Sequence, residues 1–224
     1  MKLIENLAKK EYESFCQKNI IHSHFLHSYV WGQFSKKQNH LIPYYIGYKD
    51  ENDQLVAVAL LLQKKLPLGY SYFYAPRGVV IDYQNKKLLK SFTNDLKLFA
   101  KRQKAIFIKI DPDLKLHDLD SDGNVIEASK NQEKMVEVFT SLGYRHLGFN
   151  QNFEHSQPRF TFRLDLSPSL EEITQHFHPT TRKIINKGNP YHLHLIKNDP
   201  NTIDDFFEVM KKTAERENIV NHTY

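Results

Sequence analysis

The chain has 224 residues and a formal net charge of +5. Its 40% hydrophobic and 25% charged content is that of a globular protein and excludes a fibrous or disordered one. The longest apolar run, residues 55–62, is too short to span a bilayer, and the single Cys16 excludes an internal disulfide. We therefore expect a cytoplasmic protein. The positive charge favours anionic partners, although composition alone is explained by a solvated, lysine-rich surface.

Residues 5–19 have the spacing of an amphipathic helix, and Ser28 is a suitable cap for a short helix that ends at residue 34. Residues 41–66 then read as a strand, a polar turn at 50–53 and a second, strongly apolar strand. The first part of the chain is thus predicted to place two helices before a β-hairpin.

The stretch YFYAPRGVVIDY, residues 72–83, contains two strand-like runs separated by Pro76, Arg77 and Gly78. Proline cannot donate to a sheet ladder, and glycine permits a close backbone approach, so a tight bend is predicted here. A bend exposes backbone and a cation to a ligand. Arg77 is the cation that this bend would expose.

Helix and strand signals alternate after this bend. Residues 86–104 have helical apolar spacing, residues 105–112 read as a buried strand that ends at a proline, and residues 131–144 read as a helix closed by Gly143. Residues 159–166 alternate strictly between apolar and polar side chains, as in a strand with one buried face. The order predicts a mixed α/β fold.

The pattern changes after residue 166. Ser167 or Ser169 is a suitable helix cap, with Glu172 placed for a capping box. A strand is predicted at 191–197, followed by a helix capped by Asn201 or Thr202. We expect three segments: a first unit at 1–166, a helical connector at 167–190, and the start of a second, truncated unit at 191–224.

No sequence pattern predicts a metal or nucleotide site. The clustered His22, His24 and His27 have no cysteine or acidic partner in a zinc-type spacing, so surface or cleft histidines are expected. Neither a Walker loop nor a GxGxxG fingerprint is present.

Two basic segments are more informative. Arg182, Lys183 and Lys187 fall within two helical turns, with Thr180 and Thr181 as predicted caps, which suits either a phosphate contact or an ordinary connector helix. In WGQFSKK, residues 31–37, aromatic side chains precede two lysines, as in a phosphate or nucleobase contact, or in a core tryptophan beside solvated lysines.

Six stretches together resemble the Fem family of peptidoglycan-bridge aminoacyltransferases, and they occur in that family's order. They are FLHSYVWGQFSKK, YAPRGVVIDY, IKIDPDL, QPRFTFRLDL, FHPTTRKIINKGN and FFEVMKKTAEREN. The resemblance implies a GNAT-like (acetyltransferase-like) unit followed by the start of a second GNAT-like unit, with a cleft between them. It also implies transfer of glycine, alanine or serine from aminoacyl-tRNA to the stem peptide of a lipid-linked or UDP-linked muramyl pentapeptide.

The same resemblance implies roles for individual residues. Lys36 and Arg216 are the candidates for contacts with the precursor diphosphate. Tyr74 and Arg77 line the cleft, or Arg77 instead holds the bend by bonding carbonyl groups. Arg182 matches the junction of the two units, in a structural or a substrate-binding role. It implies no cofactor, because the aminoacyl ester is already activated, with aminoacyl-tRNA as co-substrate. It also implies a peripheral contact with the inner membrane face. The catalytic residue is not indicated.

The sequence departs from the family pattern at its end. The family continues with the rest of a second unit and a helical arm, so we expect a truncated chain with weak transfer activity of its own. Two alternatives stay open: a non-catalytic GNAT-like module that binds a muramyl precursor or RNA, and an acyl-CoA-dependent acyltransferase. The second is disfavoured, because the glycine-rich pyrophosphate loop of such enzymes is absent.

Overall fold

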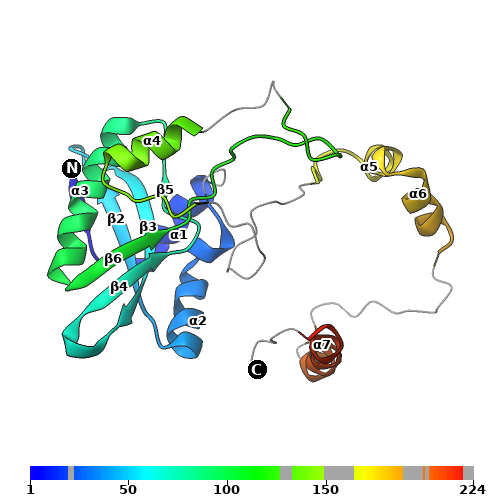
Figure 1. Cartoon of the computed structure of the whole chain (residues 1–224), viewed down its shortest axis with the longest axis horizontal. Helices are drawn as coiled ribbons and strands as arrows, with labels where there is room; N and C mark the ends of the chain where they lie inside the picture. Colours follow the sequence, from blue (N-terminus) through cyan, green and yellow to red (C-terminus); the bar gives the residue numbers. More distant parts are fainter. Residues whose placement is uncertain (20–22, 127–132, 149–163, 189–198, 200–201, 219–224) are drawn as a thin grey trace. The chain divides into compact units, whose positions relative to one another are not determined.

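The computed structural model describes residues 1–19, 23–126, 133–148, 164–188, 199 and 202–218 (Figure 1). Two compact units make up the chain, Met1–Phe149 and Asn150–Tyr224. The predicted segment boundaries at residues 166 and 190 stay predictions. In the described ranges, no helix combines the length and the apolar character needed to cross a membrane.

Unit 1 is built on a twisted, open sheet with the strand order β1-β2-β3-β4-β6. Neighbouring strands are antiparallel except β4 and β6, which run parallel, and the short β5 pairs with β3 beside this path. This arrangement confirms the predicted mixed α/β fold class. The strands are β1 (Lys2–Ile4), β2 (Ile42–Lys49), β3 (Leu55–Lys65), β4 (Ser71–Ala75), β5 (Val80–Ile81) and β6 (Ala105–Ile110).

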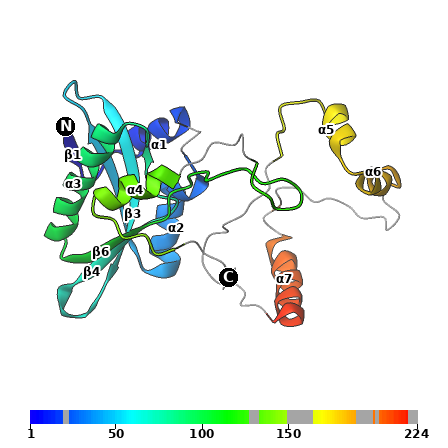
Figure 2. The same ribbon diagram turned by 45° about the horizontal axis from the view of Figure 1, so that its top comes forward.

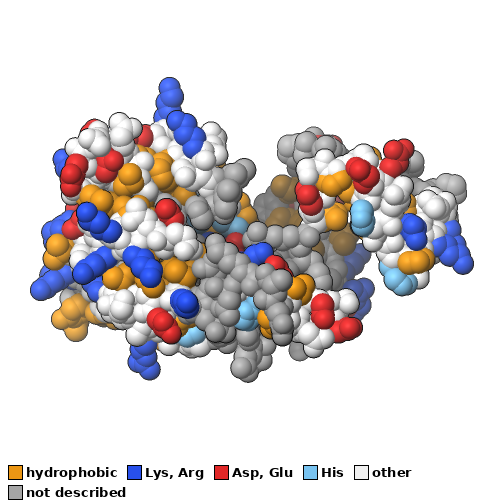
Figure 3. All heavy atoms as spheres, turned by 90° about the horizontal axis from the view of Figure 1, so that it is seen from above, with side chains coloured by type: hydrophobic (Ala, Val, Ile, Leu, Met, Phe, Trp, Pro, Cys, Tyr) orange, Lys and Arg blue, Asp and Glu red, His pale blue; other side chains and the backbone are white. Residues whose placement is uncertain are grey.

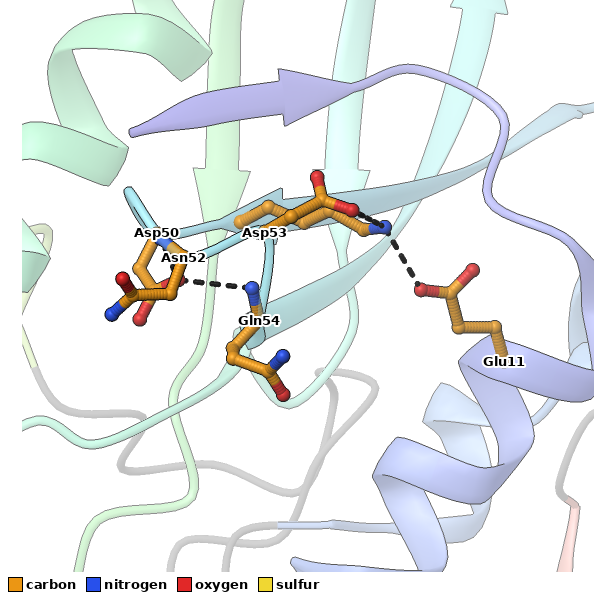
Figure 4. A network of polar contacts seen from close by, with 6 residues as sticks. Glu11, Asp50, Asn52, Asp53 and Gln54 are labelled. Atoms are coloured by element: carbon orange, nitrogen blue, oxygen red, sulfur yellow. Dashed lines mark hydrogen bonds and ion pairs between the residues drawn. The ribbon is translucent and has the colours of Figure 1, made fainter.

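The β2–β3 turn is closed by side chains, as the polar sequence at 50–53 predicts. Asp50 Oδ1 accepts a hydrogen bond from the backbone N–H of Gln54 at 2.9 Å (Figure 4). Lys49 Nζ lies 3.2 Å from Asp53 and 3.4 Å from Glu11 on α1 (Lys9–Lys18), so one ammonium group joins the hairpin to the first helix. Such surface ion pairs contribute little stability individually, but they fix geometry.

One face of the sheet is covered by α3 (Lys86–Arg102) and α4 (Glu133–Ser141) (Figures 1 and 2). The predicted apolar stripe of α3 is buried on this face. The hydroxyl of the fully buried Tyr48 on β2 donates to Asp95 at 2.6 Å and lies 2.8 Å from Ser91 Oγ, so α3 is also held by polar contacts. The buried stripe consists of Leu88, Leu89, Phe92, Leu96 and Phe99.

The opposite face is covered by α1, a 3₁₀ turn η1 (Phe25–His27) and α2 (Tyr29–Asn39). Ser28 caps α2 as predicted, accepting a hydrogen bond from the N–H of Trp31 at 3.1 Å. The side of α2 that carries Gly32 and Ser35 is buried. A Cβ at position 32 would overlap the hydroxyl of Tyr45 on β2, so glycine is what lets α2 lie this close to the sheet.

Two helix boundaries differ from the predictions. The first helix begins at Lys9 rather than residue 5, because residues 2–4 pair with β2 and the N–H of Leu7 donates to the Tyr45 carbonyl at 2.8 Å. The second helix continues past residue 34 to Asn39, where His40 ends it in the left-handed conformation, with φ of 54°. A further 3₁₀ turn, η2 (Pro67–Gly69), joins β3 to β4.

Unit 2 contains three described helices, α5 (Leu170–His176), α6 (Pro179–Asn186) and α7 (Ile203–Glu217). Ser169 and Glu172 form the predicted capping box of α5. The predicted threonine cap of α6 is wrong: His178 caps it, because Pro179 fits the first helical turn, where no N–H is needed. Thr202 precedes α7 as predicted, although its side chain makes no capping bond.

Two predicted strands fall on residues that the structure leaves undescribed. The strand at 191–197 lies outside the described residues, as do residues 159–163 of the strand at 159–166. In the described remainder, Leu164 and Leu166 are not in a strand, and they are 58% and 74% exposed.

We predict that Gly32→Ala lowers the free energy of unfolding by about 1–3 kcal/mol, because the added methyl group pushes against Tyr45. In a free helix the same change would stabilise by roughly 1 kcal/mol, so the sign of the effect is decisive. Urea denaturation measures it. The control is Gln38→Ala at an exposed position of α2, which should change stability little. A stabilised Gly32→Ala variant would contradict the close seating of α2.

Candidate functional site

The candidate site lies where the two parallel strands end. Ala75 of β4 pairs with Ile110 of β6, and both strands stop at these residues. In open α/β sheets, ligands bind outside the carboxyl ends of parallel strands. The segments 76–78 and 111–113 therefore border the position at which this fold class most often holds a ligand.

The bend after β4 has the features of a type II turn. The N–H of Gly78 donates to the Ala75 carbonyl at 3.0 Å, Pro76 occupies the second position, and Arg77 in the third has φ of +56°. Gly78 also has positive φ, and a Cβ there would lie 2.9 Å from the Pro112 Cα. The predicted bend is confirmed. The two strand runs pair with β3 rather than with each other, since β4 contacts residues 62–65 and β5 residues 57–58.

Asp111 fastens this bend to the end of β6. Its Oδ1 accepts the backbone N–H of Arg77 at 2.8 Å, and its Oδ2 accepts the hydroxyl of Tyr74 at 3.0 Å. Burial raises the pKa of Asp111, against the lowering effect of these two hydrogen bonds and of the charges of Arg77 and Lys109. Sequence reasoning did not select Asp111. The prediction that the preceding strand is buried is wrong, because β6 is the last strand of the sheet order and its Ile106 and Phe107 are 57% and 49% exposed.

The Arg77 side chain runs along the same edge. Its Nη1 lies 3.7 Å from Asp113 Oδ1, and the side chain is only 16% exposed. Its buried Nε has no hydrogen-bond partner among the described residues. The structure thus brings Tyr74 and Arg77 together through Asp111.

His27 lies beneath the bend and is 1% exposed, so the expectation of a surface or cleft histidine is wrong for this residue. Its Nδ1 accepts the N–H of His24 at 2.9 Å, which leaves the proton of the neutral ring on Nε2. Nε2 makes no hydrogen bond of good geometry within the described residues. Burial lowers the pKa of His27 to about 4, against the raising effect of the backbone of Arg77 and Pro76.

The other predicted site residues lie on separate helices. Lys36 is exposed in the last turn of α2 and forms no ion pair among the described residues. In unit 2, Arg182 stands on one open side of α6 together with Lys183 and Lys187. Arg216 on α7 is exposed and pairs with Glu217 at 2.7 Å. Within the described ranges, no group of three His, Cys, Asp or Glu side chains is placed to hold a metal ion.

We predict that His27 makes stability depend on pH between 6.5 and 4. Because its pKa is lowered in the folded state, the unfolded chain binds the extra proton first, and stability is lost as the pH falls through this window. The shift from 6.5 to about 4 corresponds to about 3 kcal/mol. Denaturant unfolding at a series of pH values should show the loss in the native chain.

The matched variants are His27→Asn, which keeps an acceptor for the His24 N–H, and His40→Asn at an exposed left-handed position. The first should flatten the pH dependence and the second should leave it unchanged. An unaltered slope in His27→Asn would assign the effect to other groups.

Comparison with known proteins places these features in a family. The FemAB family model matches residues 7–224. The chain is 31% identical to the aminoacyltransferase FemA of Staphylococcus aureus over 167 residues, which are 72% of this chain and 38% of that protein. It is 30% identical to FemA of Staphylococcus epidermidis over 154 residues, 66% of this chain and 35% of that protein.

The fold comparison agrees. The crystal structure of FemX superposes with a TM-score of 0.81 at 26% identity, over 99% of this chain and 52% of FemX. The matches thus span little more than a third of FemA and about half of FemX. Since the family model covers nearly all of the sequence, the chain belongs to the FemAB family.

Proposed function

We propose that this chain is the N-terminal part of an aminoacyltransferase that adds glycine, alanine or serine to the stem peptide of a peptidoglycan precursor. The observation that carries the proposal is the match of residues 7–224 to the FemAB family, together with the similarity to FemA. The donor is aminoacyl-tRNA, and the acceptor is a lipid-linked or UDP-linked muramyl pentapeptide. The reaction takes place in the cytoplasm and uses no cofactor.

Aminoacyl transfer requires that the two substrates are held in the correct orientation and that one proton is removed from the acceptor amine. The acceptor amine attacks the ester carbonyl of the aminoacyl-tRNA, the tRNA hydroxyl leaves, and the amine gives up a proton. Holding the two reactants in line supplies a large part of the rate. The strand-end site fits such a role, because Tyr74, Arg77 and Asp111 hold one another in fixed positions.

Asp111 has capacity left for a substrate. Each carboxylate oxygen already accepts one hydrogen bond, and each has a second lone pair. Its raised pKa also moves the group toward the range in which a carboxylate accepts a proton usefully. We propose that Asp111 orients the acceptor amine, while Tyr74 and Arg77 keep its carboxylate in place.

The acceptor diphosphate is proposed to bind at Lys36. This lysine stands exposed on α2, which covers the sheet face toward which Tyr45 of β2 and Tyr74 of β4 point. An ammonium group without an acidic partner in the described residues is available for a phosphate.

The polyanionic tRNA is proposed to contact the basic surface of unit 2. Arg182, Lys183 and Lys187 stand on one open side of α6. Arg216 on α7 stays a proposed contact of the precursor diphosphate, together with Lys36. Lysine and arginine side chains also stand out over the described surface of unit 1 (Figure 3). This charge attracts nucleic acid at long range without distinguishing its sequence.

A transfer assay tests the proposal. The chain, and a longer version that covers the length of its relatives, are given glycyl-, alanyl- and seryl-tRNA with labelled amino acids and a muramyl-pentapeptide acceptor. We expect label on the acceptor with the longer version and little with the 224-residue chain. Precursor binding without transfer by either version would overturn the enzyme assignment and support a binding module instead.

We predict that Lys36→Ala raises the dissociation constant for the UDP-linked muramyl pentapeptide by roughly tenfold or more, since a charge-assisted contact to the diphosphate is lost. Isothermal titration calorimetry measures this value. Lys37→Ala is the matched control, because it removes an equal charge from the next position of α2. Equal affinities of the Lys36→Ala variant and the native chain would remove Lys36 from the site.

A further inference from the structure

The bend after β4 is contacted from two opposite sides through one peptide group, the one between Pro76 and Arg77. The described residues contain no cis peptide bond, so the N–H and the carbonyl of this group point in opposite directions. The N–H donates to Asp111 Oδ1 at 2.8 Å. The Pro76 carbonyl therefore points away from Asp111, to the other side of the bend.

His27 lies on that other side and is 1% exposed. Burial lowers the pKa of its ring, and the backbone of Arg77 and Pro76 acts against this lowering. Carbonyl oxygens that face a ring N–H have such an effect, because they favour the protonated form of the ring. The imidazole of His27 thus faces the carbonyl side of the same peptide group whose N–H side faces Asp111.

The 3₁₀ turn η1 directs the proton of His27 toward the bend. His27 Nδ1 accepts the N–H of His24 at 2.9 Å, so the neutral ring carries its proton on Nε2. The Tyr12 hydroxyl donates to the His27 carbonyl at 2.8 Å and fixes its backbone. Among the described residues, Nε2 has no single partner of good geometry. A proton shared between the carbonyls of Pro76 and Arg77 has this property, because neither branch of a three-centre bond is straight.

The bend has an alternative conformation that would relieve Arg77. Type I and type II turns differ by about half a turn in the orientation of the peptide group between their second and third residues. A type I bend would give Arg77 a negative φ, in place of the costly +56°. The rotated carbonyl would then face the Asp111 carboxylate, and the rotated N–H would face the Nε2–H of His27. Two acceptors would meet on one side of the bend and two donors on the other.

We propose that His27 is a positioning residue that, together with Asp111, holds the peptide group between Pro76 and Arg77 in its type II orientation. Asp111 opposes the rotation only while it is ionised, because a protonated carboxyl group can donate to the rotated carbonyl. Neutral His27 opposes the rotation in either state of Asp111. Under the proposed function, on which this step rests, the carboxylate that orients the acceptor amine keeps one position whether or not it carries a proton.

Other charged and titratable groups near the bend act on the ionisation of these two residues. The hydrogen bond from Tyr74 and the charges of Arg77 and Lys109 favour the carboxylate of Asp111, and Tyr83 also faces it. His24 disfavours the charged ring of His27, whereas Asp113 favours it. Burial is the largest effect on the pKa of His27 and lowers it to about 4, so the ring is a neutral N–H donor at neutral pH.

Amide hydrogen exchange of the 224-residue chain, measured by NMR, tests the proposal with two complementary variants. His27→Asn keeps an acceptor for the His24 N–H but removes the donor that faces the bend. His27→Gln does the reverse, since its amide nitrogen takes the place of Nε2. We expect the Arg77 amide to exchange roughly fivefold faster or more in His27→Asn, and to stay within about twofold of the native rate in His27→Gln.

The Gly78 amide is the internal control. Its N–H donates to the Ala75 carbonyl at 3.0 Å, and both turn types keep this bond, so its exchange should not change in either variant. Faster exchange of both amides would mean that the bend loosens as a whole, and would overturn the proposal. So would an unchanged Arg77 rate in His27→Asn.

A rescue variant tests the role of the left-handed residue. Glycine adopts positive φ without cost, so adding Arg77→Gly to His27→Asn should slow exchange at position 77, relative to its intrinsic rate, below that of His27→Asn alone. An equal or faster rate would show that the amide opens by a route other than rotation of the peptide group, and would reject the proposed orientation role.

The exchange measurement needs no substrate, which separates this inference from the proposed function. The expected exchange pattern, with no transfer by any version of the chain, would reject the proposed function and leave His27 as the residue that orients the bend. Transfer by the longer version, with no effect of His27→Asn on exchange, would reject the role of His27 alone. Where both stand, His27→Asn should lower kcat of the longer version and leave KM for the precursor unchanged, and His27→Gln should retain most of kcat.

Discussion

The carboxylate of Asp111 is the contact on which the strand-end site depends. It accepts the backbone N–H of Arg77, a residue that the bend forces into the left-handed region. That conformation costs a non-glycine residue about 1–2 kcal/mol. A hydrogen bond to a charged group contributes about 1.5–3 kcal/mol, which is enough to offset it. Burial in turn disfavours the charged carboxylate, and the hydrogen bonds from Tyr74 and Arg77 offset part of that cost.

A second constraint acts from the other side of the bend. His27 is buried beside the backbone of Pro76 and Arg77. Its own carbonyl accepts a hydrogen bond from the Tyr12 hydroxyl at 2.8 Å, which fixes its position. A neutral imidazole suits this place because a charged ring would be desolvated without a paired anion. The loop before α2 therefore supports the bend after β4, although the two segments are about fifty residues apart in the sequence. Packing between η1 and the bend at 76–78 therefore brings two local turns together at the ends of β4 and β6.

The sequence predicted what local patterns determine. Helical spacing located α3 and α4, the Ser28 and Ser169 caps were identified, and the hairpin turn at 50–53 was placed correctly. Strand β1 was missed because three residues carry no period and form only by pairing with β2. The roles of Asp111 and His27 were missed for a related reason. Both depend on contacts with the 76–78 bend. Asp111 reaches it only through the crossover between the parallel strands β4 and β6, and His27 reaches it from a turn about fifty residues earlier, so no spacing rule links either residue to the bend.

The net charge of this chain and the local surroundings of its cations contribute differently to ligand recognition. A net charge of +5 favours any polyanion, and so cannot by itself separate one anionic partner from another. Discrimination needs cations held in different surroundings. Gly32 packs α2 against the sheet. Lys37 then lies on the same side of the helix as Val30 and Phe34, whereas Lys36 lies about 100° away around the helix. Adjacent residues of equal charge therefore stand in different surroundings through the helix period alone.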